Sequence, residues 1–282
     1  MAESTIVLGG EGYSTDLILA LVRATDAAAV AARSQWAHHD KDGADEAAVA
    51  AMRSVLLYAP FDGTVVIGEG EKDAAPMLAN GERLGAGGRA YDIAVDPLDG
   101  TRLVAEGLPG SIAVIALAPS GTMFDPVDVF YMDKLICSAA GRDVVDIRRP
   151  VAENVRALAD AVGRPQAGLV VAVLDKPRHA KLIAEIWSTG ATVRLIGEGD
   201  ISAAVSAASG EIHLALGIGG TPEGIVAACA VRALGGFMQG RLAPQNATQV
   251  ENAMRAGHDL ERVLELDDLV NSDDVLFVMT PV

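Results

Sequence analysis

Residues 168–236 alternate short apolar segments with segments that repeat apolar residues at helical spacing, and this alternation decides the fold class. The apolar segments are GLVVAVL (168–174), ATVRLI (191–196) and EIHLALGIGG (211–220). The helical segments are HAKLIAEIWSTG (179–190), DISAAVSAASG (200–210) and EGIVAACAVRALGG (223–236). Apolar strands separated by helices are typical of parallel β–α units. We therefore predict an α/β arrangement for the second half of the chain.

The first half of the chain has a different order of elements. Residues 15–55 have helical spacing, interrupted by HHDKDGAD (38–45), and Asp45 is the expected cap of the second helix. A short helix is predicted over 154–162, and a short helix and a strand over 257–282. Strands are predicted in FDGTVVIGEGE (61–71), YDIAV (91–95), SIAVIALA (111–118) and DVFYMDKLICSAA (128–140). We predict an α+β part over 1–165 and an α/β part over 166–282.

Composition excludes several classes of protein. Half of the 282 residues are apolar and 21% are charged, which excludes a disordered chain. With 22 basic and 38 acidic residues the net charge is −16, which argues against a nucleic-acid-binding protein. The longest apolar runs are shorter than the ~20 residues of a membrane span, and no secretory signal is visible. Cys137 and Cys229 lie in apolar surroundings, so we expect a buried, reduced pair in a cytoplasmic protein.

Three stretches place acidic residues beside glycines at the ends of predicted elements. They are Asp45, the segment 68–73 (GEGEKD) and the segment 96–101 (DPLDGT). In the last, a strand followed by a Pro- and Gly-containing turn can direct two carboxylates at one point. Oxygen ligands without interleaved Cys or His favour Mg²⁺ or Mn²⁺ over zinc. Taken alone, DPLDGT is equally well an Asp-Pro/Asp-Gly surface turn; together with Glu69 and Glu223, it favours a metal site.

Two neighbouring cations suit phosphoryl transfer, because they neutralise phosphate oxygens and lower the pKa of a bound water. The candidate ligands come from separate segments and are Asp45, Glu69, Asp96, Asp99 and Glu223. Thr101 can orient the attacking water through its hydroxyl, with Asp73 as the proton acceptor.

The second half supplies candidate phosphate ligands. Lys176 and Arg178 follow a predicted strand and precede a helix, where basic side chains can hold a phosphate. Seen alone, this segment is equally well the solvated start of a helix. GIGGTPEG (217–224) can offer backbone N–H groups, although its spacing matches neither a dinucleotide fingerprint nor a P-loop. Glu198 and Asp200 lie between a strand and a helix, where they can bind sugar hydroxyls or cap the helix.

Several long motifs occur in an order that resembles the class II fructose-1,6-bisphosphatases, from about residue 13 to residue 278. They are IGEGEKDAAPMLANGERLG, DIAVDPLDGTRLVAEGLPGSIAVIA, YMDKL, KPRH, GIGGTPEG and GGFMQGRL. Many members of this family also act on sedoheptulose 1,7-bisphosphate, and the wider lithium-sensitive phosphatase superfamily includes the inositol monophosphatases. The resemblance implies a five-layer αβαβα sandwich that hydrolyses a sugar bisphosphate with two Mg²⁺ or Mn²⁺ ions.

The resemblance also implies roles for individual residues. It gives the five carboxylates named above as metal ligands, Thr101 and Asp73 as the residues that activate water, and Lys41 as a lysine near the metal site. The substrate-binding residues that it implies are Asp99, Gly100, Thr101, Tyr131, Lys176, Arg178, Glu198, Asp200 and Gly220.

The chain departs from the family pattern at several positions. Asp99 replaces a Glu of the family, Glu198 replaces an Asp, one extra residue precedes Tyr131, and the sequence stops at MTPV where the family continues. These departures favour retained chemistry with altered sugar recognition, for example of a seven- or eight-carbon sugar bisphosphate. The alternatives are a phosphatase of inositol or sugar monophosphates and a non-catalytic protein that binds phosphosugars. We expect a homo-oligomer, a dimer or a tetramer, without nucleic-acid or membrane partners.

Overall fold

The computed structural model describes residues 4–10, 12–69, 71–72, 75–76, 78–126 and 129–282. Contacts divide the chain into two compact units, one formed by Met1–Asp125 with Val270–Val282 and the other by Pro126–Leu269. The expected division near residue 165 differs from these limits, because the strand over Tyr131–Cys137 pairs with strands of the second unit. Each unit is described separately below.

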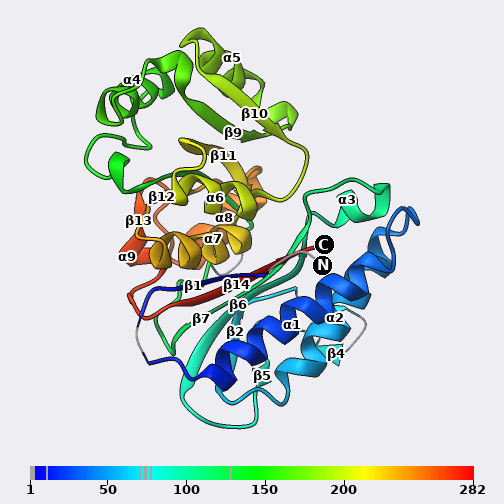
Figure 1. Ribbon diagram of the computed structural model, residues 1–282. Helices are drawn as coiled ribbons and strands as arrows, with labels where there is room; N and C mark the ends of the chain where they lie inside the picture. The colour runs from blue at the N-terminus through cyan, green and yellow to red at the C-terminus, as the bar shows by residue number, and fades with distance from the viewer. Residues whose placement is uncertain (1–3, 11, 70, 73–74, 77, 127–128) are drawn as a thin grey trace. The chain divides into compact units, whose positions relative to one another are not determined.

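The first unit packs two long helices on a six-stranded mixed sheet (Figure 1). The strand order is β1-β14-β7-β6-β2-β5, with β6 and β2 parallel and the other neighbours antiparallel. The helices are α1 (Thr15–Arg33), α2 (Lys41–Leu56) and the short α3 (Thr101–Glu106). The strands are β1 (Thr5–Leu8), β2 (Asp62–Ile67), β5 (Arg83–Leu84), β6 (Ala90–Asp99), β7 (Ile112–Pro119) and β14 (Leu276–Pro281). A separate ribbon pairs β3 (Glu71–Lys72) with β4 (Ala75–Pro76).

Small residues let α1 and α2 approach each other closely, side by side in Figure 1. Ala24, Ala28 and Ala32 of α1 and Ala44 and Ala48 of α2 are all fully buried in one apolar cluster with side chains of the sheet. The predicted cap of the second helix is wrong. Asp40 caps α2, accepting a hydrogen bond from the backbone N–H of Gly43, because the helix begins one turn earlier than its apolar spacing indicates.

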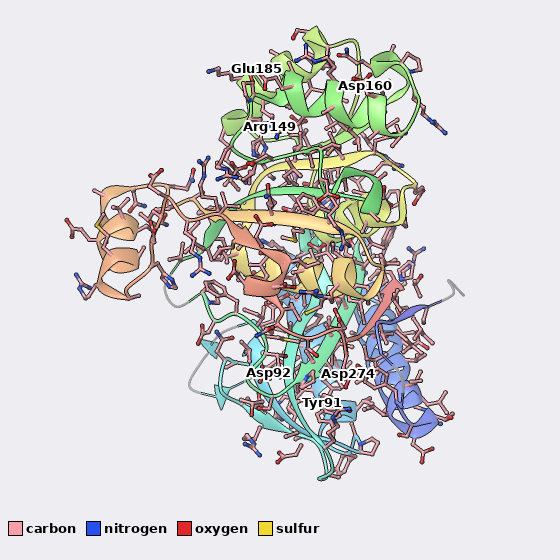
Figure 2. All side chains as sticks on the ribbon, turned by 90° about the vertical axis from the view of Figure 1, so that its left-hand side faces the viewer. Tyr91, Asp92, Arg149, Asp160, Glu185 and Asp274 are labelled. Carbon is pink, nitrogen blue, oxygen red and sulfur yellow. The ribbon has the colours of Figure 1, made fainter. Side chains whose placement is uncertain are left out.

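The strand β6 continues beyond the predicted YDIAV segment. It runs through Asp99 because Asp96 and Asp99 both pair with β7, with a shift of register between them. Earlier in the strand lies Asp92, which is labelled in Figure 2. It is buried and accepts hydrogen bonds from the backbone N–H groups of Thr122 and Met123, at 2.9 and 3.0 Å. That carboxylate therefore has a structural task.

The second unit contains a six-stranded mixed sheet of order β10-β9-β11-β8-β12-β13. Its strands are β8 (Tyr131–Cys137), β9 (Val170–Leu174), β10 (Thr192–Ile196), β11 (Leu214–Gly220), β12 (Phe237–Leu242) and β13 (Leu264–Glu265). Its helices are α4 (Val151–Ala161), α5 (Ala180–Ser188), α6 (Asp200–Ser209), α7 (Thr221–Ala233), α8 (Ala247–Arg255) and α9 (Leu266–Leu269). Short 3₁₀ turns cover Ala139–Gly141, Gln166–Gly168 and Pro177–His179.

The parallel β–α units predicted for the second half are confirmed in β9, β10 and β11, with α5 and α6 between them. The strands β8, β12 and β13, each antiparallel to the strand before it in the sheet, complete the sheet, so the mixed α/β class is confirmed. The five-layer stacking stays a prediction. Cys137 and Cys229 are both buried, as expected. Among the described residues, no helix has the length and apolar character needed to span a membrane.

Candidate functional site

The DPLDGT turn is held by hydrogen bonds of its own. Asp96 Oδ1 accepts from the backbone N–H of Leu98 at 3.0 Å, and the Thr101 hydroxyl donates to the Leu98 carbonyl at 3.1 Å. Gly100 has φ +86°, a left-handed conformation that glycine adopts readily, and its carbonyl accepts from Ser111 Oγ at 2.8 Å. Asp99 is only 6% exposed. The second carboxylate of this turn is therefore buried, unlike that of a plain surface turn.

The other acidic residues of the first unit come from separate elements. Asp45 lies one turn inside α2 and is 8% exposed, and Glu69 follows β2, with its backbone N–H donating to the Leu78 carbonyl at 3.1 Å. Lys41 is the first residue of α2 and is exposed. Asp73, the predicted proton acceptor, lies outside the described residues.

The second unit gathers Asp200, Glu223 and a buried lysine that the sequence analysis missed. Lys134 on β8 is 5% exposed, and its Nζ donates to Asp200 Oδ2 at 2.6 Å and to the Gly220 carbonyl at 3.0 Å. Asp200 is the first residue of α6, and Gly220 ends β11 directly before α7. The sequence does carry a signal for Lys134, because it is a charged residue within an apolar strand segment. A charged residue in such a segment is rarely buried without a partner.

Glu223, in the first turn of α7, carries an unsatisfied oxygen. Its Oε2 is buried and has no hydrogen-bond partner among the described residues. Burial raises the pKa of this carboxyl, Asp200 raises it further, and Lys134 acts in the opposite direction. A buried carboxylate oxygen without a donor is the kind of group that a cation satisfies.

These residues fit a hard divalent cation by their chemistry, because every candidate donor is an oxygen atom. Asp45, Glu69, Asp96 and Asp99 belong to the first unit and Glu223 to the second. Within the part of the chain that the structure describes, no three His, Cys, Asp or Glu side chains form a metal-binding group. The convergence of all five carboxylates on two ions therefore stays a prediction.

Hydrogen bonds join the KPRH segment (176–179) to the end of β11. Arg178 donates to the Ile218 carbonyl from Nε at 3.0 Å and from Nη2 at 2.7 Å. Its guanidinium carbon lies 5.4 Å from the centroid of the Tyr131 ring, a cation–π arrangement. The structure thus brings together Arg178 and Tyr131, which the sequence analysis assigned to the substrate site.

His179, next to Arg178, also holds this segment in place by hydrogen bonds. It is 2% exposed, its Nδ1 lies 2.8 Å from the Leu174 carbonyl, and its Nε2 lies 2.8 Å from the backbone nitrogen of Ile218. Because the Ile218 N–H must donate, Nε2 is the unprotonated nitrogen and Nδ1 carries the proton. Burial lowers the pKa of His179, in keeping with a neutral ring. The sequence analysis missed this role of His179, because the spacing of KPRH does not indicate which backbone groups the ring will contact.

The remaining predicted substrate residues lie at element ends in the second unit. Lys176 is half-buried directly before the 3₁₀ turn at Pro177–His179. Glu198 lies in the loop between β10 and α6 and is half-buried. Asp200 does not use its side chain to cap α6, whose cap residue is Gly199.

Comparisons with known proteins identify the same family that these motifs resemble. Residues 15–282 match the model of the family described as bacterial fructose-1,6-bisphosphatase, glpX-encoded. The chain is 40% identical over 280 residues to the fructose-1,6-bisphosphatase class 2 of Haemophilus influenzae (strain ATCC 51907 / DSM 11121 / KW20 / Rd), covering 94% of this chain and 84% of the relative. It is also 40% identical over 281 residues to fructose-1,6-bisphosphatase 1 class 2 of Escherichia coli (strain K12), covering 94% of this chain and 83% of the relative.

Among solved structures, the extragenic suppressor protein suhB from Bartonella henselae matches with a TM-score of 0.41 and 17% identity, over 71% of this chain and 75% of that chain. The match to the family model covers the DPLDGT, KPRH and GIGGTPEG motifs together. Members of this family are metal-dependent phosphoric monoester hydrolases of phosphorylated sugars. The chain therefore belongs to the bacterial, glpX-encoded fructose-1,6-bisphosphatase family.

Proposed function

We propose that this protein is a metal-dependent phosphatase that removes one phosphate from a sugar bisphosphate. The observation that carries the proposal is the family match over residues 15–282, together with 40% identity to class 2 fructose-1,6-bisphosphatases. Fructose 1,6-bisphosphate, sedoheptulose 1,7-bisphosphate and a longer sugar bisphosphate are the candidate substrates. In the reaction, a water oxygen bonds to phosphorus while the bond from phosphorus to the sugar oxygen breaks. The products are inorganic phosphate and a sugar monophosphate.

Two Mg²⁺ or Mn²⁺ ions are the proposed cofactors. Their ligands would be Asp45, Glu69, Asp96, Asp99 and Glu223, and the unsatisfied buried Oε2 of Glu223 supports this donor set. When bound, such ions neutralise phosphate oxygens and make a water molecule more acidic.

The chain's own residues then orient the reactants. Thr101 holds the attacking water, Asp73 accepts its proton, and Lys41 adds positive charge beside the carboxylates. The fixed turn around Gly100, with its hydrogen bond from Ser111, supports a rigid placement of Asp99 and Thr101. Preorganisation of this kind lowers the cost of reaching the reactive geometry.

The second unit provides the groups that bind the sugar phosphate. Arg178, held over Tyr131, and Lys176 bind the phosphate that is not transferred. Asp200 and Glu198 accept hydrogen bonds from sugar hydroxyls, and Gly220 lines the same site. Glu198 and Asp99 are the positions at which a changed side-chain length would alter the preferred sugar. Self-association and a cytoplasmic location stay predictions.

Phosphate release tests the proposal directly. The purified protein is incubated with fructose 1,6-bisphosphate, sedoheptulose 1,7-bisphosphate, fructose 6-phosphate and inositol 1-phosphate, each with Mg²⁺, with Mn²⁺ and with EDTA. We expect release from at least one bisphosphate, faster than from either monophosphate, and its loss with EDTA. A preference for monophosphates would replace this proposal with the inositol or sugar monophosphatase alternative. Binding of sugar phosphates without any release would favour the non-catalytic alternative.

A further inference from the structure

The buried ion pair between Lys134 and Asp200 lies at the junction of three elements of the second unit. Lys134 comes from β8, Asp200 begins α6, and Gly220, whose carbonyl also accepts from Lys134, ends β11. A lysine that is only 5% exposed loses most of its hydration, so its charge must be offset by partners. The Nζ–Oδ2 distance of 2.6 Å to Asp200 and the 3.0 Å distance to Gly220 supply that compensation.

This one ammonium group joins the beginnings of two helices. Asp200 starts α6, and Gly220 is the residue directly before α7, which carries Glu223 in its first turn. An ammonium has three donor hydrogens and can satisfy two acceptors in different directions at once. Lys134 thereby sets the distance between the Asp200 carboxylate and the start of the helix that carries Glu223.

Lys134 also orients the Asp200 carboxylate. Because Oδ2 of Asp200 is bound to Lys134, the orientation of its whole carboxylate is set. A carboxylate with one oxygen held in this way can offer its other oxygen to a sugar hydroxyl in a defined direction.

We propose that Lys134 is a positioning residue for substrate recognition, which holds Asp200 in the orientation that binds the sugar and keeps the α7 start in place. This inference rests on the proposed function, because it assigns Asp200 to the sugar of a sugar-phosphate substrate. Lys134 itself needs no contact with the substrate in this role.

The test uses Lys134→Met, which keeps most of the length of the side chain and removes its charged amino group. We expect KM for the bisphosphate to rise about tenfold, within the range of effects measured for contacting pairs. In an Asp200→Asn background the same substitution changes KM less than about twofold, because the partner of Lys134 is already neutral. This dependence on Asp200 shows that Lys134 acts on KM through Asp200, and thermal unfolding measures any loss of stability separately.

Lys181→Met is the matched control. Lys181 lies on α5 in the same unit, its side chain is 90% exposed, and its ion pair with Glu185 at 3.7 Å is a surface pair. We expect this variant to have the KM of the parent protein. Thermal unfolding of every variant is measured beside the kinetics. If Lys134→Met does not fold, Lys134→Leu, which also lacks donors for Asp200 and Gly220, replaces it in the same comparison.

The outcomes distinguish this inference from the proposed function. If the parent releases phosphate, an unchanged KM in a folded Lys134→Met protein, or an equal rise in both backgrounds, overturns the role of Lys134. If the parent releases none, the proposed function fails, and calorimetric binding of fructose 6-phosphate takes the place of KM. The Lys134 inference then stands only if Lys134→Met weakens that binding and the effect disappears in the Asp200→Asn background; absent binding by the parent overturns it.

Discussion

His179 and Ile218 are joined by a hydrogen bond in which the backbone N–H of Ile218 donates to Nε2 of His179 at 2.8 Å. The carbonyl of the same Ile218 accepts from Arg178, so two consecutive side chains bind both backbone groups of one residue. The neighbouring strand β9 ends at Leu174, and its pairing with β11 stops at Leu216. The KPRH segment therefore satisfies backbone groups of β11 that its parallel neighbour no longer reaches, and this places Arg178 at the end of the sheet.

Replacing His179 with Phe is expected to destabilise the protein. The Ile218 N–H and the Leu174 carbonyl would each lose a partner in a partly buried place, at a cost of roughly 1–3 kcal/mol for each group. Urea unfolding followed by circular dichroism measures the change in free energy. His38→Phe, at an exposed position, is the control. A His179→Phe protein as stable as the parent would show that these two hydrogen bonds do not contribute.

Stability is also expected to fall below about pH 6.5, in part through His179. Burial lowers the pKa of His179 from its usual 6.5, so the unfolded chain binds a proton in a pH range where the folded protein does not. The stabilisation is complete above pH 6.5 and declines as the pH falls from there toward the lowered pKa. Around the ring, Arg178 lowers this pKa further, while Asp133 and Asp200 act in the opposite direction.

Unfolding free energies measured between pH 7.5 and pH 5 check this expectation. A His179→Gln variant should have a smaller loss over that range than the parent. His213, whose pKa burial also lowers, remains in both proteins and contributes equally. Identical pH profiles for parent and variant would contradict the assignment of this effect to His179.

Asp96→Asn is expected to abolish turnover while the protein stays folded. The amide oxygen can still accept from the Leu98 N–H, but the negative charge proposed for metal binding is lost. The loss of kcat/KM should exceed the ~10–100-fold cost of losing an outer-shell partner of a metal ligand. Steady-state phosphate release and thermal unfolding are measured together.

Asp92→Asn provides the matched control on the same strand. Asp92 binds the backbone N–H groups of Thr122 and Met123, so its substitution should lower stability and leave kcat/KM of the folded protein nearly unchanged. Comparable activity losses in both variants would remove the support for Asp96 as a ligand.

Gly219→Ala is expected to disturb the Lys134–Asp200 ion pair. A Cβ at this position would lie 2.1 Å from Asp200 Oδ2 and 2.8 Å from Lys134 Nζ, so the carboxylate would have to move. We expect a raised KM for the sugar bisphosphate, measured by phosphate release. Gly168→Ala is the control in the same unit, since its Cβ would meet only ordinary contacts beginning at 3.6 Å. Equal KM values for the two variants would show that the site tolerates the displacement.

Local spacing in the sequence identified most strands and helices, because each apolar pattern reflects which face of an element is buried. It placed the helix of α7 after GIGG and the parallel units around β9, β10 and β11, as the structure has them. Among the elements that were missed, β1 is only four residues long and half-exposed, and α8 is mainly polar.

The DPLDGT turn and the family membership were also recognisable from residues alone, because the motifs are long and their order is preserved. Spacing could not reveal that β14, near the end of the chain, pairs between β1 and β7, nor that β8 joins β11 and β12. Nor could it reveal that Lys134 binds Asp200 or that His179 binds Ile218. Sheet partners and buried polar contacts join residues that are far apart in the chain. Their free energy depends on which residues are near in space, and periodicity along the chain does not encode this.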